Sequence, residues 1–285
     1  MKVTKVYKTG DKTINEDNFV INGSNRIYAA IDGATGLAGV PGQIASQVVK
    51  HELEEKSTNK TLHDRVELAN EQLALKIMEY FNEHIRTVNE FEEIHKEERS
   101  STGLAAIQLD EARHYFDYIQ AGDCMLFLQY ENGDIRTITF DHVQQLDQMA
   151  VREIIKLRNS SGNHDLGIKE LLEKVKPILL TNRNKLNTFE GYGIIDGSKE
   201  AMENLEYGRV SMRRVKKILL LSDGLTMPTQ DPNQDGWKLS VEFAFQHGLD
   251  ALLEEVSKRE ESDPECVVYP RLKPRDDKTG VLIEV

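Results

Sequence analysis

The stretch RIYAAIDGATG at residues 26–36 decides the fold. After Arg26 it is apolar as far as residue 31, as in a buried strand, and Asp32-Gly33 then supplies a turn signal. Residues 18–21 form a second strand pattern, and NGSN at residues 22–25 joins the two as a turn. We therefore expect residues 18–31 to form an antiparallel hairpin that ends at an aspartate.

Two helical patterns follow this hairpin. Residues 43–55 carry apolar side chains at helical spacing, and residues 66–85 repeat them every three or four positions. Thr61 and Asp64 give the second pattern a capping-box-like start. Each predicted helix therefore has one apolar face that can cover a sheet.

The rest of the chain is rich in strand patterns with short turns between neighbours, which implies antiparallel pairing. Residues 142–176 are helical in pattern, residues 181–213 are irregular, and residues 239–261 predict a third long helix. Strands grouped between helices favour an α+β fold of layers over alternating βαβ units. The further predicted strands are residues 103–109, 114–120, 125–130, 135–139, 215–221 and 280–285.

Composition limits the class of partner. The 285 residues include 48 acidic and 36 basic side chains, a formal net charge of −12, which argues against nucleic acid or an anionic membrane. Two cysteines cannot form a disulfide framework. The apolar runs fall far short of the roughly 20 residues of a membrane span, and residues 1–5 lead into polar sequence without a signal-peptide core. We expect a cytoplasmic protein.

Acidic residues recur where predicted strands begin or end. A single Asp-Gly pair is most simply a turn. However, burying an unpaired carboxylate is costly, so several acids brought together would need a cation between them. Oxygen ligands suit Mg²⁺ or Mn²⁺, and the joint pattern therefore suggests a divalent-metal site. The acids in question are Glu16, Asp17, Asp32, Asp123, Asp223, Asp276 and Asp277.

Short motifs in a fixed order along nearly the whole chain resemble those of the metal-dependent protein phosphatases, the type 2C serine/threonine phosphatases. Each motif is short, but their collinear order and spacing are specific. They are Asn15-Glu16-Asp17, AIDGATG at residues 30–36, Ser101-Thr102-Gly103, Ala121-Gly122-Asp123, TFDH at residues 139–142, LLLSDGL at residues 219–225 and DDKTGV at residues 276–281.

This resemblance implies a four-layer α-β-β-α sandwich with two central antiparallel sheets and a binuclear metal site at one edge. Residues 1–285 would form a single domain, in which residues 143–213 take the place of the family's variable flap. Glu16 would hold a metal-bound water, and Asp277 stands where the family usually has an amide. The residues implied to bind two Mn²⁺ or Mg²⁺ ions are Asp17, Asp32, Gly33, Asp223 and Asp276.

The activity implied is hydrolysis of phosphoserine and phosphothreonine in proteins, with a metal-bridging water as the nucleophile. Lys12 stands where the family has a phosphate-binding arginine, so the charge is kept but the bidentate fork is lost. Ala34 stands where many members have a leaving-group histidine, which leaves the general acid unassigned. A third metal would use Asp123 with Asp223 and an acid at position 227, and Met227 argues against that third ion.

A pseudophosphatase that binds phosphoproteins with weak or no turnover is the alternative, and Lys12, Ala34 and Met227 favour it. Against it, every carboxylate expected for the two-metal centre is present, whereas loss of catalysis would more naturally remove a ligand first. We therefore expect an active enzyme.

Overall fold

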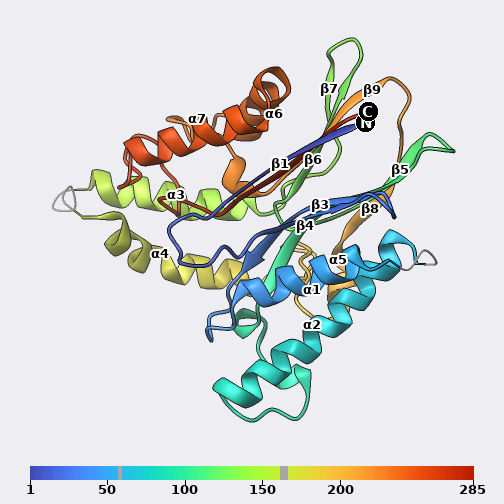
Figure 1. Cartoon of the computed structure of the whole chain (residues 1–285). Coiled ribbons are helices and arrows are strands. Elements are labelled where there is room, and N and C mark those ends of the chain that lie inside the picture. The colour runs from blue at the N-terminus through green and yellow to red at the C-terminus, as the bar shows by residue number, and fades with distance from the viewer. Residues whose placement is uncertain (57–59, 161–165) are drawn as a thin grey trace.

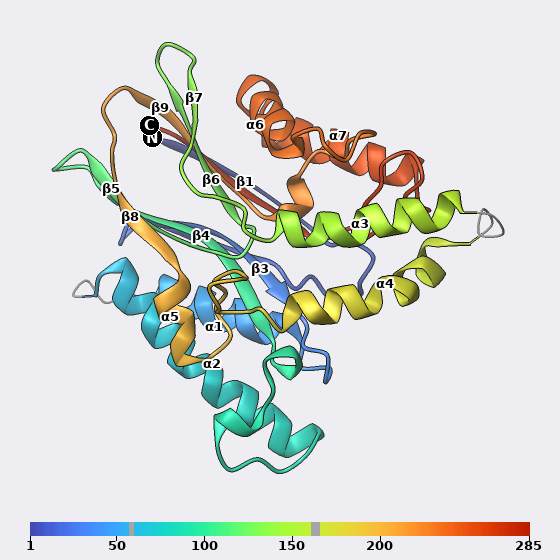
Figure 2. The same cartoon turned by 180° about the vertical axis from the view of Figure 1, so that it is seen from behind.

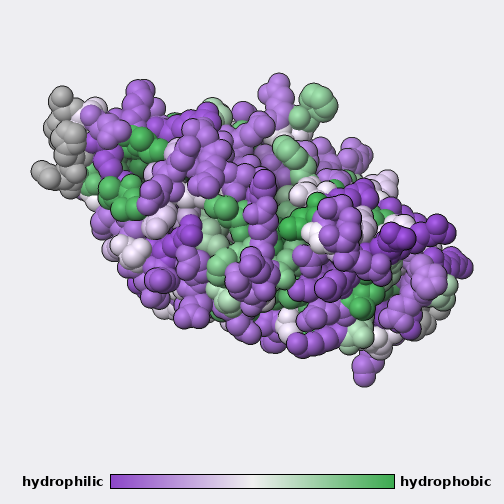
Figure 3. Space-filling view, turned by 90° about the horizontal axis from the view of Figure 1, so that it is seen from above, coloured by the Kyte–Doolittle hydropathy of each residue, from purple (hydrophilic) through white to green (hydrophobic). Residues whose placement is uncertain are grey.

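The computed structural model describes residues 1–56, 60–160 and 166–285. Two five-stranded antiparallel sheets pack face to face, and helices cover both outer faces (Figure 1). This arrangement confirms the expected α+β sandwich. Seen from above, the surface is mainly hydrophilic with scattered hydrophobic patches (Figure 3). In the described part of the chain, no helix is both long and apolar enough to cross a bilayer.

The first sheet has the strand order β1-β10-β9-β6-β7. Helices α6 (Gly236–His247) and α7 (Leu249–Ser262) cover its outer face (Figure 1). Along β9, Leu219 and Leu221 pack towards these helices, whereas Ile218 and Leu220 pack between the sheets, as the two-residue period of a strand requires. The strands are β1 (Lys2–Lys8), β6 (Met125–Tyr130), β7 (Ile135–Thr137), β9 (Val215–Leu221) and β10 (Lys278–Glu284).

The second sheet has the strand order β2-β3-β4-β5-β8. Helices α1 (Gly42–Glu54) and α2 (Leu62–His84) cover its outer face, and the capping box of Thr61 and Asp64 starts α2 as expected. The hairpin pairs β2 with β3 from Asn22 opposite Ile27 onward, as predicted. The strands are β2 (Asn18–Asn22), β3 (Ile27–Ala34), β4 (Ser101–Asp110), β5 (Tyr115–Ala121) and β8 (Glu206–Ser211).

Helices α3 (Gln144–Asn159) and α4 (Ile168–Arg183) lie side by side at one end of the sandwich (Figure 2). They share a small core of their own, which includes Ile154, Leu171 and Val175. The region proposed to be a flap, residues 143–213, thus contains this helix pair, although residues 161–165 lie outside the described residues.

Four of the predicted elements differ in the structure. The turn expected at Asp32-Gly33 is wrong, because β3 continues to Ala34 and pairs with β4 through both residues. The prediction of a single helix over residues 239–261 is wrong, because Gly248 has a φ of 91° and separates α6 from α7. Residues 181–213 are only partly irregular, since they contain α5 (Lys199–Asn204) and β8. The strand over residues 135–139 ends earlier, at Thr137.

Strand β1 has no counterpart among the predicted strands. It pairs with β10 from Lys2 opposite Glu284 onward, which brings the two ends of the chain together (Figure 1). Val6 is its single buried side chain, so the apolar alternation that marks a strand is almost absent. Lysines at positions 2, 5 and 8 instead suit an exposed sheet edge.

Asp277, just before β10, fixes the loop that leads into β2. Its Oδ1 accepts the backbone N–H of Gly10 at 2.8 Å, and its Oδ2 accepts that of Glu16 at 2.8 Å. An asparagine has one acceptor oxygen, so its NH₂ group would face one of these N–H groups. Because the side chain is buried, Asp277→Asn should lower the free energy of unfolding by about 2 kcal/mol.

Urea denaturation measures this difference. The matched control is Asp250→Asn, which changes an exposed aspartate in the first turn of α7. Equal stability of the two variants would show that Asp277 does not hold the loop.

Candidate active site

Five aspartates reach the same end of the sandwich because of how the strands pair. In the second sheet, Asn18 lies opposite Ile31, which places Asp17 and Asp32 next to each other just beyond that pair. In the first sheet, Leu221 lies opposite Gly280, so Asp223 and Asp276 come from neighbouring strand ends. Asp123 lies in the connection between β5 and β6, where the chain passes from one sheet to the other.

Three of these carboxylates form what we call the acid cluster: Asp32, Asp123 and Asp223. One oxygen from each lies within 4.8 Å of the others. The pKa values of Asp32 and Asp123 are raised well above the ordinary value, mainly by burial and to a lesser extent by the charges of the neighbouring aspartates. The buried Oδ1 of Asp223 has no hydrogen-bond partner among the described residues. The acid cluster thus has too few positive charges and hydrogen-bond donors around it to balance its carboxylates.

Asp17 and Asp276 adjoin the acid cluster. Burial and the charge of Asp276 raise the pKa of Asp17 to about 8, although Ser222 Oγ donates a hydrogen bond of 2.8 Å to Asp17 Oδ2. Burial also raises the pKa of Asp276, against the opposing charge of Lys273. For Asp223 burial acts in the same direction, but Lys273 and hydrogen bonds outweigh it, so the pKa of Asp223 is lowered.

The donor set fits a hard divalent cation. All five side chains offer carboxylate oxygens, and the unpartnered oxygen of Asp223 is buried where such an ion would neutralise it. Gly33 follows Asp32 on β3, and a Cβ there would lie 2.3 Å from the carbonyl oxygen of Glu16. Only glycine therefore allows the end of β3 to approach the segment that carries Asp17.

Glu16 and Lys12 lie beside the acid cluster. Glu16 Oε1 accepts the backbone N–H of Gly42 at 2.9 Å and the hydroxyl of Thr35, and its Oε2 accepts the ammonium of Lys12. Lys12 lines a cavity of about 510 Å³ that the acid cluster also lines. The structure thus brings the expected phosphate-binding cation to this cavity, and the expected water-holding carboxylate of Glu16 lies buried behind it, bonded to Lys12.

Lys273 and Asp147 also line this cavity, and no sequence pattern pointed to either residue. Lys273 donates a hydrogen bond to Asp276 Oδ2, and although burial opposes it, the charges of Asp276 and Asp223 raise the pKa of Lys273. Asp147, on α3, has its pKa raised to about 7 by burial and by Asp223. Lys273 lies in an irregular segment and Asp147 on a separate helix, so no local pattern ties either residue to the acids.

Met227 is buried in the core beneath α6 and α7, so its side chain belongs to packing. Asp147 of α3 lines the same cavity as Asp123 and Asp223 and adds a further acid there. The residue at position 227 therefore does not predict which acids line this cavity.

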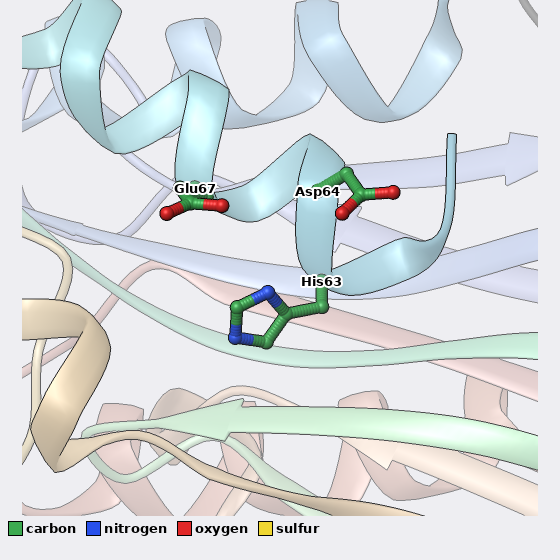
Figure 4. Close-up of side chains that lie close together, drawn as sticks. All are labelled: His63, Asp64 and Glu67. Atoms are coloured by element: carbon green, nitrogen blue, oxygen red, sulfur yellow. The ribbon is translucent and has the colours of Figure 1, made fainter. Parts of the chain in front are cut away.

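A second group of possible metal ligands lies on α2: His63, Asp64 and Glu67 (Figure 4). Asp64 accepts the backbone N–H of Thr61 at 2.8 Å and closes the capping box of the helix. The His63 ring packs edge-on against Tyr207, with the ring centres 5.4 Å apart. Capping and packing therefore account for this group without a metal.

Comparison with known proteins supports a single family. The family model described as protein phosphatase 2C matches residues 8–262. No curated protein matches the chain in sequence. Similar solved structures include the serine/threonine phosphatase PstP/Ppp of Mycobacterium tuberculosis, with 18% identity, a TM-score of 0.56, and coverage of 100% of this chain and 98% of that chain.

Two further solved structures are similar over comparable lengths. The serine/threonine phosphatase Stp1 from Staphylococcus aureus has 16% identity and a TM-score of 0.56, over 100% of this chain and 94% of that chain. The catalytic domain of PstP in complex with two manganese ions has 18% identity and a TM-score of 0.53, over 99% of this chain and 97% of that chain. At these identities the likeness shows the shared fold.

The match over residues 8–262 goes further, because it covers the whole second sheet, strands β6, β7 and β9 of the first sheet, and every residue of the acid cluster. The chain belongs to the protein phosphatase 2C family and is a metal-dependent protein serine/threonine phosphatase.

Proposed function

We propose that this phosphatase hydrolyses phosphoserine and phosphothreonine in proteins at the acid cluster and its two neighbouring aspartates. The observation that carries this assignment is the convergence of Asp32, Asp123 and Asp223 within 4.8 Å, with one buried oxygen unpartnered among the described residues. In a chain of this family, such a group of acids is best explained by a role in holding cations.

The proposed ligands of two divalent ions are Asp17, Asp32, Asp223, Asp276 and the carbonyl oxygen of Gly33. Manganese is our first choice, because the similar PstP catalytic domain holds two manganese ions; magnesium has the same preference for oxygen ligands. When bound, such ions would lower the pKa of a water molecule between them and offset the negative charge of the phosphoryl group.

The chain's own side chains would hold these ligands and bind the phosphate. Ser222 Oγ orients Asp17 with its hydrogen bond, and Thr102 Oγ1 donates a hydrogen bond of 2.6 Å to the backbone oxygen of Asp32. Glu16, held by Thr35 and Gly42, would position the attacking water. The ammonium of Lys12 would pair with a phosphoryl oxygen as a point charge.

We further propose that residues 1–285 form one domain, within which residues 143–213 serve as the flap. Helices α3 and α4 support this role, because Asp147 and Arg183 from them line the cavity of the acid cluster. We propose phosphoproteins as the partners, with no nucleic acid, since the formal net charge is −12. A cytoplasmic location would suit such substrates.

The pseudophosphatase alternative gains no support from the geometry. Lys12, Ala34 and Met227 had favoured it, but the described structure places Lys12 in the cavity of the acid cluster and Met227 in the core. The four aspartates that we propose as ligands lie at or beside the acid cluster, which favours an active enzyme.

Turnover of p-nitrophenyl phosphate and of a phosphothreonine peptide tests the assignment. We expect hydrolysis with Mn²⁺, none after chelation of the metal, and a fall in kcat of more than about 100-fold in Asp32→Ala, because even partners outside the ligand set typically contribute 10–100-fold. Asp250→Asn is the control. Turnover that survives chelation, or that Asp32→Ala leaves unchanged, would refute the proposed site.

The role of Lys12 can be tested separately. Lys12→Met should raise the inhibition constant for inorganic phosphate by roughly tenfold, because a charge-assisted hydrogen bond is worth about 1.5 kcal/mol or more. Lys12→Arg should restore most of the affinity, since it keeps the charge. If phosphate inhibits Lys12→Met as strongly as it inhibits the parent enzyme, Lys12 does not bind the phosphoryl group.

A further inference from the structure

Helix α4 has two apolar faces, and one of them is only partly covered by the protein. Leu171 and Val175 are buried in the small core shared with α3. Leu172, Leu179 and Leu180 are half-buried and line the cavity of about 510 Å³, and Leu172 and Leu179 also pack against the edge of that core. Because Leu172, Leu179 and Arg183 are seven and then four residues apart, they lie on one side of the helix.

The opposite wall of the cavity comes from the loop between β3 and α1. Leu37 in this loop is 50% exposed and lines the same cavity. The guanidinium of Arg183 donates a hydrogen bond of 2.7 Å to the backbone oxygen of Thr35, which joins α4 to this loop. This hydrogen bond links the two walls directly. We call Leu37, Leu172, Leu179 and Leu180 the apolar strip.

The apolar strip is continuous with the acid cluster, because the same cavity is lined by Asp32, Asp123 and Asp223. A phosphorylated side chain that reaches the acid cluster therefore brings its neighbouring residues against the apolar strip. Lys176 and Glu173, which also line the cavity on α4, form an exposed ion pair at 3.6 Å. Their charges offset each other, so this pair does not select for a positively or a negatively charged substrate residue. Apolar contact is thus the main recognition that this part of the cavity offers.

We propose that the apolar strip is a substrate subsite for an apolar side chain directly flanking the phosphorylated residue, so that the enzyme prefers phosphopeptides with leucine or isoleucine beside phosphoserine or phosphothreonine. This inference rests on the proposed function, since the phosphorylated residue must reach the acid cluster. On this proposal, α4 selects substrates that carry an apolar residue next to the phosphorylated one.

The experiment compares two phosphothreonine peptides that differ only in the residues flanking the phosphothreonine, leucine in one and serine in the other. We expect kcat/KM to be about tenfold or more higher for the leucine peptide, as is typical of burying apolar groups in a pocket. Leu37→Gln and Leu179→Gln should erase this preference, whereas Leu75→Gln, an exposed change on α2, should keep it.

Leu37→Gln is the principal variant, because Leu37 is half exposed and its change should not disturb folding. Binding of fluorescently labelled peptides, measured by anisotropy, gives the same comparison without turnover. Equal kcat/KM and equal affinity for the two peptides in the parent enzyme would overturn the proposal, as would a preference that both variants retain. Hydrolysis of p-nitrophenyl phosphate separates the two claims: its absence counts against the proposed function, whereas its presence without peptide preference counts only against the subsite.

Discussion

Mutual repulsion among carboxylates at one end of the sandwich is the constraint on which the rest of the structure depends. Asp32, Asp123 and Asp223 lie within 4.8 Å of one another, and Asp17 and Asp276 adjoin them. Such a group of partly buried charges opposes folding unless cations offset it. The surrounding chain supplies only part of that charge, through Lys273 beside Asp276 and Lys12 beside Glu16. Divalent ions would supply the remainder, so the feature that costs stability is also the one that makes the site chemically useful.

The two-sheet fold provides a rigid frame for these acids. Each sheet contributes a pair of neighbouring strand ends, and the core between the sheets keeps the two pairs together. The helices α3 and α4 contribute differently, because they share their own small core and meet the cavity from one side. The strands therefore position the charged groups, and α3 and α4 form part of the wall of the cavity beside them.

Much of this arrangement could be predicted from the chain because the signals are local. The buried runs before Asp32 and Asp223 were both located correctly as strands, although β3 continues through Asp32-Gly33, where a turn was expected. The break at Gly248 was missed because the apolar period continues across it. Strand β1 was missed because a lysine-rich edge shows little alternation. Lys273, Asp147 and the apolar strip depend on tertiary placement, for which a single sequence carries no local signal.

The most direct test of the central claim is a calorimetric titration of the metal-free protein with Mn²⁺ at pH 7, repeated in two buffers of different ionisation enthalpy. Burial and the charge of Asp276 raise the pKa of Asp17 to about 8, which favours the protonated carboxyl in the metal-free protein, so cation binding there should release protons. The account predicts two bound ions per chain with release of protons, and loss of this binding in Asp32→Ala. An absence of binding, or binding that Asp32→Ala leaves intact, would contradict it.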